Sequence, residues 1–245
     1  MDLIEITRQL ALDLNTLEFS PPVTHVYNPL EYARQSHENF LKRFGEGRKE
    51  VVFLGMNPGP WGMAQTGVPF GEVGIVRDWL QIDEPVGRPE QEHPVKPVTG
   101  MDCTRSEVSG RRLWGLFREK AGTPDAFFSR FFVLNYCPLL FLEETGRNRT
   151  PAQLPAAERR QIMSICDEAL RRFIETLGVK IVIGIGQYAE DRAQEALATK
   201  DLRIGRILHP SPASPAANRD WAGTALRQLD ELGIRLDEKP GTKAG

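Results

Sequence analysis

The sequence has little of what marks several large classes of protein. Only three of its 245 residues are cysteines, namely Cys103, Cys137 and Cys166, and they form no CxxC pair. This spacing favours neither a zinc site, nor an iron–sulfur cluster, nor a disulfide framework. No apolar run is long enough for a membrane span, and no signal peptide is visible. We therefore expect no metal, no other cofactor, no membrane contact and a cytoplasmic location.

Strong charge and complete nucleotide-binding motifs are also missing. The formal net charge is -2, so any contact with nucleic acid needs positive potential that is local. Gly184 and Gly186 lack the third glycine of a dinucleotide fingerprint, and no P-loop is present. These gaps argue against a phosphate- or nucleotide-handling enzyme, although its fold would be similar.

Short apolar runs that alternate with amphipathic segments are what the sequence does have. Runs such as Val51-Val52-Phe53-Leu54 are continuous rather than alternating, which is typical of parallel strands buried on both faces. We expect strands at residues 51–54, 131–134, 180–183 and 206–208. We expect helices at about residues 3–17, 32–44, 73–80, 113–117, 155–177 and 221–232, and one more helix that begins near residue 188. The pattern predicts an α/β protein, a three-layer α/β/α sandwich around a central four-stranded, mostly parallel sheet.

Domain organisation follows from the same pattern. We expect a single domain over residues 1–236 and a disordered polar tail over residues 237–245. Residues 84–100 contain four prolines and are expected to run over the surface as a loop.

Three polar residues follow three of the predicted strands. Asn57 comes after the first strand, Asn135 ends the second and His209 follows the fourth. Because parallel strands place their carboxyl ends at one edge of the sheet, we expect these side chains to share one cleft. The Gly- and Pro-rich loop between Gly55 and Gly71 lies at the same edge, where it brings backbone close to a ligand.

Four segments carry a resemblance to a known family. They are GMNPGP at residues 55–60, GMAQTGVPFG at 62–71, NYCPL at 135–139 and HPSP at 209–212. Together they closely resemble the single-strand-selective monofunctional uracil-DNA glycosylases, over roughly residues 20–235, and the chain looks like a bacterial member. The HPSP segment alone is shared across the wider superfamily.

The resemblance implies a uracil-DNA glycosylase-like fold and a role in base excision repair. A member flips uracil, and by the same resemblance 5-hydroxymethyluracil, out of single- or double-stranded DNA and hydrolyses the N-glycosidic bond, without lyase activity, leaving an abasic site. By the same resemblance, Asn57 holds the attacking water and His209 acts on the leaving base. Phe70 stacks on uracil, Asn135 reads its edge, and the pocket is shaped by Met56 and Gly59.

The resemblance also implies how DNA is held. The loop after His209 would enter the duplex as a wedge made of Pro210, Ser211, Pro212, Ala213, Ser214 and Pro215. Vertebrate members carry an arginine where Ala213 stands and a phenylalanine where Trp61 stands. A small, uncharged wedge favours single-stranded or mismatched DNA over paired duplex, and Arg147, Arg149 and Arg219 are candidate phosphate contacts. The expected partner is uracil-containing DNA, bound by a monomer that associates with the bacterial nucleoid.

Two other interpretations of the site stay open. One is a glycosylase whose specificity is shifted toward the deaminated purines xanthine and hypoxanthine. The other is a non-catalytic protein that binds damaged bases, which would hold uracil-containing DNA without releasing the base.

Overall fold

The computed structural model describes residues 2–237. Its central element is a parallel four-stranded sheet, as the sequence predicts, and the structure shows the strand order β3-β2-β6-β7. The strands are β2 (Val51–Gly55), β3 (Phe131–Asn135), β6 (Ile181–Ile185) and β7 (Arg203–Ile207). The expected tail lies outside the described residues except for Asp237, and the division into one domain over 1–236 stays a prediction.

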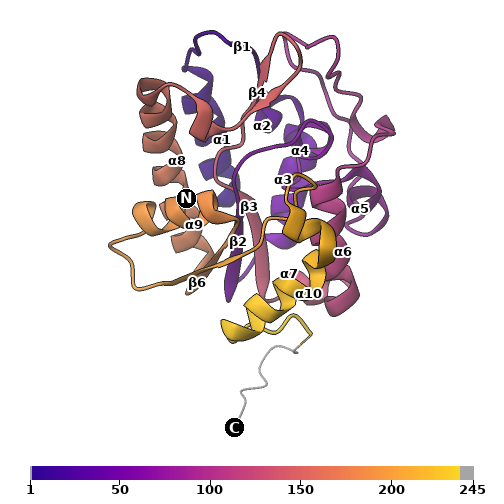
Figure 1. Cartoon of the computed structure of the whole chain (residues 1–245), viewed down its shortest axis with the longest axis vertical. Helices are drawn as coiled ribbons and strands as arrows, with labels where there is room; N and C mark the ends of the chain where they lie inside the picture. Colours follow the sequence, from indigo (N-terminus) through magenta and orange to yellow (C-terminus); the bar gives the residue numbers. More distant parts are fainter. Residues whose placement is uncertain (1, 238–245) are drawn as a thin grey trace.

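Helices cover the sheet on both sides (Figure 1). On one side lie α1 (Leu3–Asn15), α8 (Ala156–Leu177) and α9 (Gln187–Ala196), and on the other lie α6 (Val108–Ala121), α7 (Pro124–Phe128) and α10 (Pro215–Glu231). Aromatic rings fill the layer between β2 and the second group, where Phe117 lies 4.9 Å from Phe53 and 4.5 Å from Phe127 between ring centroids. The three-layer α/β/α architecture is confirmed.

The helix ends follow local rules in most places. Asp2 and Glu5 form a capping box at the start of α1, and α8 ends at Gly178, whose φ of 61° suits glycine. The helix expected at 32–44 is instead two helices, α2 (Pro29–Tyr32) and α3 (Arg34–Phe44), because Ala33 between them leaves helical geometry. The strand expected at 206–208 begins earlier, at Arg203.

A second, antiparallel sheet was not foreseen. It has the order β1-β4-β5, from β1 (Val23–Tyr27), β4 (Leu140–Glu143) and β5 (Asn148–Arg149). The stretch 84–100 packs against it: Tyr27 Oη accepts from the His93 N–H at 2.7 Å and donates to the Lys96 carbonyl at 2.8 Å. His93 and Val98 are buried, so the expectation of a wholly superficial loop is wrong. The short helices are α4 (Met63–Thr66), α5 (Val73–Asp78), η1 (Gly100–Asp102) and η2 (Pro151–Gln153).

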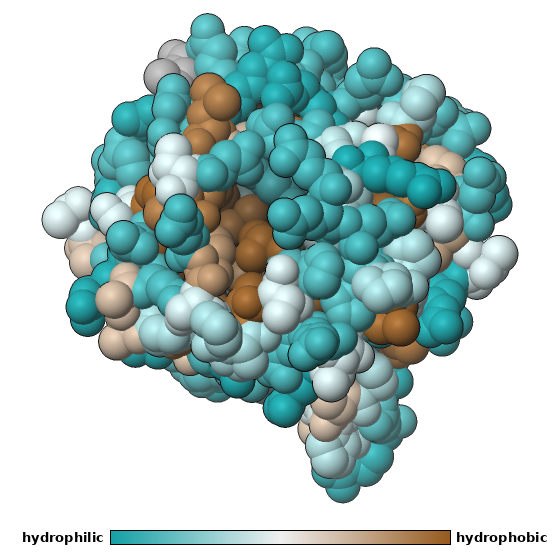
Figure 2. Space-filling view, turned by 90° about the horizontal axis from the view of Figure 1, so that it is seen from above, coloured by the Kyte–Doolittle hydropathy of each residue, from teal (hydrophilic) through white to brown (hydrophobic). Residues whose placement is uncertain are grey.

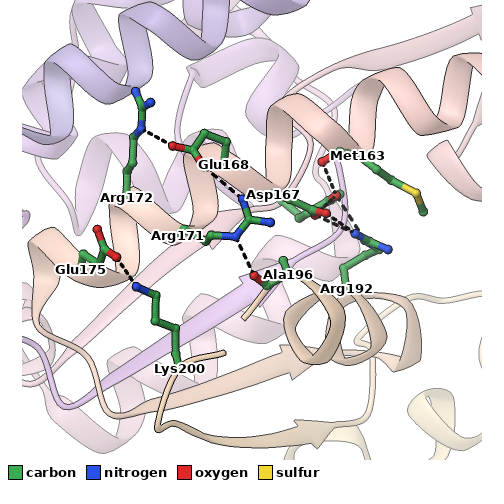
Figure 3. A network of polar contacts seen from close by, with 10 residues as sticks. Met163, Asp167, Glu168, Arg171, Arg172, Glu175, Arg192, Ala196 and Lys200 are labelled. Atoms are coloured by element: carbon green, nitrogen blue, oxygen red, sulfur yellow. Dashed lines mark hydrogen bonds and ion pairs between the residues drawn. The ribbon is translucent and has the colours of Figure 1, made fainter. Parts of the chain in front are cut away.

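Ion pairs join α8 to α9 and to the segment that follows it (Figure 3). Arg192 of α9 donates to both carboxylate oxygens of Asp167 on α8, at 2.7 and 2.6 Å. Arg171 donates to the Ala196 carbonyl at 2.9 Å, and Lys200 pairs with Glu175. Arg192 is buried, so its pairing with Asp167 compensates the cost of removing a charge from water.

The outer surface is mainly polar. On the face seen from above in Figure 2, hydrophilic residues dominate and hydrophobic residues gather in a recess left of centre. Within residues 2–237, no helix combines the length and apolar character that a membrane crossing requires.

Candidate active site

A cavity of about 220 Å³ lies at the carboxyl edge of the parallel sheet. It brings together the six residues that the sequence assigns to catalysis or to the base pocket: its lining includes Met56, Asn57, Gly59, Phe70, Asn135 and His209. A larger hollow of about 910 Å³ beside β1 contains none of them. The convergence expected from the strand ends is therefore present in the structure.

Asn135 presents an unpaired acceptor to this cavity. Its Nδ2 group donates to Met63 Sδ at 3.2 Å, while its Oδ1 atom is buried and has no hydrogen-bond partner within the described residues. Buried polar atoms are nearly always hydrogen-bonded in folded proteins. An unpaired amide oxygen in a cavity wall is therefore a mark of a ligand-binding position.

Phe70 lies against Asn135 in an unusual backbone conformation. Its φ of 53° is in the left-handed region that residues other than glycine rarely adopt. A Cβ atom at Gly55 would collide with both the Phe70 ring and Asn135 Oδ1, so glycine at this position lets the ring and the amide meet. Strained backbone of this kind is concentrated at ligand sites.

Asn57 is held by backbone carbonyls. Its Nδ2 group donates to the Leu139 carbonyl at 3.3 Å and to the Pro58 carbonyl at 3.4 Å. Carbonyl oxygens only accept, so these contacts fix the orientation of the amide. The Oδ1 atom makes no hydrogen bond within residues 2–237 and is left to accept one from a ligand or water.

His209 lines the same cavity as this amide. The backbone N–H of Ser211 donates to its Nδ1 atom at 3.1 Å, and burial lowers the pKa of the imidazole. Its ring centroid is 6.2 Å from that of Phe70. Gly186, with φ of 92°, passes so close that a Cβ there would be 3.1 Å from His209 Cβ. The loop after β6 therefore packs directly against the His209 side chain.

The end of β3 is tied to the α8–α9 ion pair. Tyr136, which follows Asn135, donates to Asp167 Oδ1 at 2.5 Å and accepts from Arg192 Nε at 3.2 Å. The Cys137 N–H donates to the Met56 carbonyl at 2.9 Å, which continues the β2–β3 ladder past the last strand residue. Both contacts restrict where Asn135 and Met56 lie.

The predicted wedge loop is ordered by side chains from two helices. Arg112 of α6 donates to the Pro210 carbonyl at 3.0 Å and to Asn218 Oδ1 of α10 at 3.0 Å. Asn218 in turn donates to the Pro212 carbonyl at 2.7 Å. Pro212 and Ala213 are exposed at its tip. Of the six wedge residues only Ser211 lines the cavity.

The three candidate phosphate contacts differ in availability. Arg149 is paired with Glu143 at 2.6 Å and donates to the Gln153 carbonyl. Its charge is therefore neutralised by an ion pair within the protein. Arg147 and Arg219 are exposed, and their side chains make no hydrogen bond within residues 2–237. Only these two remain as candidates.

Positive charge also gathers beside Trp61, in the loop that forms the cavity wall. The Arg105 guanidinium lies 4.5 Å and the Lys96 ammonium 4.9 Å from the centroid of its ring. These cation–π pairs place two cations beside a residue of the loop between Gly55 and Gly71. They supply a local positive potential that the net charge of -2 does not provide.

Several lining residues were missed from the sequence. They are Met63, Glu107, Ser109, Asn148 and Thr150. Asn148 and Glu107 each contain a buried oxygen without a partner in the described part of the chain. Met63 lies inside the motif at 62–71 but was given no role, and no motif pointed to the other four, because they lie at the start of α6 and at or just after β5. Within residues 2–237, no group of three or more His, Cys, Asp or Glu side chains is arranged to hold a metal.

Comparison with known proteins agrees with this geometry. The model of the uracil DNA glycosylase superfamily matches residues 42–230. The chain is 53% identical over 233 residues to the single-strand selective monofunctional uracil DNA glycosylase of Mus musculus, covering 94% of this chain and 84% of the mouse protein. For the Rattus norvegicus protein of the same name the identity is 54%, with the same coverage.

A solved structure supports the fold. The SMUG2 protein of Pedobacter heparinus superimposes with a TM-score of 0.68 at 20% identity, over 95% of this chain and 99% of that one. The family model and the relatives at 53 and 54% identity show that the chain belongs to the uracil-DNA glycosylase superfamily and, within it, to the single-strand selective monofunctional family. The resemblance drawn from the sequence motifs is confirmed.

Proposed function

We propose that this protein is a monofunctional DNA glycosylase that flips uracil out of DNA and hydrolyses its N-glycosidic bond. The product is an abasic site, the substrate of later steps in base excision repair. We further propose that the protein acts as a monomer in the cytoplasm of a bacterium and needs no metal or other cofactor.

The observation that carries the proposal is the unpaired Oδ1 atom of Asn135 in the cavity wall. This oxygen can accept from uracil N3–H, while the second hydrogen of Nδ2 can donate to O4. Cytosine presents the opposite pattern at these positions and would leave the amide unpaired. Such a polar mismatch can discriminate by as much as about 10⁴-fold. Phe70 offers the base a stacking surface, a contact of roughly 1 to 3 kcal/mol on the usual scale.

His209 is the group proposed to stabilise the departing base. When the bond from sugar to base breaks, negative charge develops on uracil, chiefly at N1 and O2. Nδ1 of His209 accepts a backbone hydrogen bond, so the neutral ring carries its proton on Nε2 and can donate to O2. One donor of this kind contributes roughly 3 to 4 kcal/mol to transition-state stabilisation.

Asn57 is proposed to orient the attacking water through its free Oδ1 atom. A carboxamide is a poor general base, so the water is only weakly activated. The reaction must then follow a dissociative route through an oxocarbenium-like sugar, for which a weak nucleophile suffices. No lysine stands in the motifs to form a Schiff base with the abasic sugar, which supports hydrolysis without lyase activity.

Gly59 is proposed to widen the range of bases. It offers no side chain at the C5 edge of a bound pyrimidine. Uracils with a substituent at C5, such as 5-hydroxymethyluracil, should then be accepted as well. At the DNA surface, the small wedge tip at Ala213 supports a preference for single-stranded or mismatched DNA.

The test is release of free base from oligonucleotides that each carry one modified base, with EDTA present. The panel holds uracil, 5-hydroxymethyluracil, xanthine and hypoxanthine, in single-stranded and duplex form. We expect uracil to be released without metal and the strand to stay uncleaved. Release of purines alone would replace the proposal by the shifted-specificity alternative. Tight binding without any release would replace it by the lesion-binding alternative.

A further inference from the structure

The loop after His209 is poor in backbone hydrogen-bond donors. It reads PSPASP, and each of its three prolines lacks an N–H group. The three N–H groups that remain are all used within the same segment, on His209 Nδ1 and on two oxygens of Ser211. The carbonyls of Pro210 and Pro212 therefore depend on donors from outside the loop.

Two side chains from neighbouring helices supply these donors. Arg112 of α6 donates from Nη1 to the Pro210 carbonyl at 3.0 Å and from Nη2 to Asn218 Oδ1 at 3.0 Å. Asn218 of α10 donates from Nδ2 to the Pro212 carbonyl at 2.7 Å. A single planar guanidinium thus joins the residue directly after His209 to the helix that follows the loop.

The segment held in this way contains the proposed donor to the leaving base. His209 is bonded to Pro210, and the N–H of Ser211 fixes the imidazole. Arg112 is not one of the residues that line the cavity, so it acts on the flipped base through the loop. We propose that Arg112 is a positioning residue that holds this loop in one conformation. Its two hydrogen bonds orient His209 toward the flipped base and keep the wedge preformed. The assignment rests on the proposed glycosylase function.

A preformed loop raises the rate because no ordering of the loop is then required during the reaction. Without the guanidinium, the Pro210 carbonyl is left to water and the loop can populate other conformations. A displacement of about 1 Å in a catalytic group can lower a rate by about 10²-fold. The rival role for Arg112 is a contact with DNA phosphate, because both of its acceptors are neutral and leave its charge in place. Such a contact would act on DNA affinity rather than on the rate of the bound complex.

The experiment measures single-turnover release of uracil from a single-stranded oligonucleotide at increasing protein concentration. This separates the maximal rate from the half-saturating concentration. The proteins are wild type, Arg112→Met, Arg112→Lys, Asn218→Ala and the double variant Arg112→Met/Asn218→Ala. The control is Arg111→Met, at the preceding position of α6, where the exposed guanidinium donates to Ser106 Oγ at 3.4 Å.

We expect Arg112→Met and Asn218→Ala to lower the maximal rate by about 10- to 100-fold. Arg112→Lys keeps the charge but loses the planar pair of donors, so it should be slower than wild type as well. The double variant should be no slower than the slower single variant, because the two side chains act as one unit. The half-saturating concentration should stay close to that of wild type in every variant, and Arg111→Met should match wild type in both quantities.

A pH–rate profile separates positioning from a general loss of stability. The Ser211 N–H favours the neutral imidazole, and burial lowers the pKa of His209. A loosened loop weakens both effects, so the acid limb of the profile should move to higher pH in Arg112→Met, toward the usual value of about 6.5. Glu107, the other titratable residue of the cavity lining, is common to both proteins. A smaller folded fraction alone would leave the acid limb where it is.

Two results overturn the assignment. One is a maximal rate close to wild type in Arg112→Met. The other is a raised half-saturating concentration with an unchanged maximal rate, which would make Arg112 a phosphate contact. If the methionine variant does not fold, Asn218→Ala carries the same test from an exposed position, and an unchanged maximal rate there overturns the assignment as well. Absence of uracil release by wild type would instead contradict the proposed function itself.

Discussion

The backbone N–H of Ser211 donates a hydrogen bond to Nδ1 of His209 at 3.1 Å. An N–H can only donate, so Nδ1 must act as the acceptor, and a neutral imidazole then has its proton on Nε2. Burial also lowers the pKa of His209. Both effects favour the neutral ring as the donor to the leaving base.

The first prediction concerns pH. Because burial lowers the pKa of His209 below its usual value of about 6.5, more than half of the rings are neutral at pH 6.5, and the neutral fraction can less than double above it. We expect the single-turnover rate of uracil release to change little between pH 6.5 and 8 and to fall only at lower pH.

The measurement is a pH–rate profile of wild type beside Glu107→Gln, since burial raises the pKa of Glu107 to about 7. The variant separates that ionisation from the titration of His209. A rate that declines steadily as the pH rises from 6.5 to 8 in both proteins would mean that the imidazolium is the active form.

The second prediction concerns base recognition. Asn135→Ala removes the proposed acceptor for N3–H and donor to O4, so uracil release should fall by roughly 10- to 100-fold. Binding to DNA that already carries an abasic site should stay unchanged, because no base occupies the cavity there. Equal losses in release and in abasic-site binding would assign Asn135 a structural role.

The third prediction concerns the DNA strand. The exposed wedge tip at Ala213 is small and uncharged, so it fills the gap left by a flipped base poorly. We expect faster uracil release from single-stranded or mismatched DNA than from paired duplex, and Ala213→Arg should raise the paired rate selectively. Equal wild-type rates on the three substrates would exclude the wedge as the source of strand preference.

The fourth prediction concerns stability. His37 of α3 is buried and donates from Nδ1 to the Gly67 carbonyl at 2.7 Å. This hydrogen bond ties α3 to the loop between Gly55 and Gly71. Burial lowers its pKa to about 4. The unfolded chain binds this proton near pH 6.5 and the folded protein does not, so the contribution to stability is present above pH 6.5 and is lost as the pH falls toward 4. The loss is about 3 kcal/mol.

The measurement is the free energy of unfolding of wild type minus that of His37→Gln, from denaturant titrations at pH 7 and pH 4. The raised pKa of Glu107 contributes with the opposite sign, but it is common to both proteins and cancels in the difference. A difference that does not change with pH would show that His37 is accessible to protons in the folded state.

The sequence predicts the parts of this fold that depend on local pattern. The continuous apolar run at 51–54 and the strand that ends on Asn135 indicate a parallel sheet, and its geometry then brings Asn57, Asn135 and His209 to one edge. The pairing of β1 with β4 joins segments more than a hundred residues apart in the chain. No local periodicity reveals such pairing, and the second sheet was therefore missed.

The same limit applies to the site. Residues within recognised motifs, such as Phe70, could be assigned from the sequence because the motif carries their context. Glu107 could not, since its place in the cavity wall depends on Gly59 and Gly62, which pack over it from another segment. The engagement of Arg149 by Glu143 likewise depends on the hairpin of β4 and β5, which the sequence alone did not indicate.

The most direct test of the central claim is uracil release from a single-stranded oligonucleotide under single-turnover conditions, with EDTA, by wild type, Asn57→Ala and His209→Ala. We predict rapid release by wild type and losses of about 10²-fold or more in each variant, because one removes the group that orients water and the other the donor to the leaving base. Asn57→Asp should retain part of the activity by supplying a base in the same place. Near wild-type rates in both alanine variants would contradict the account.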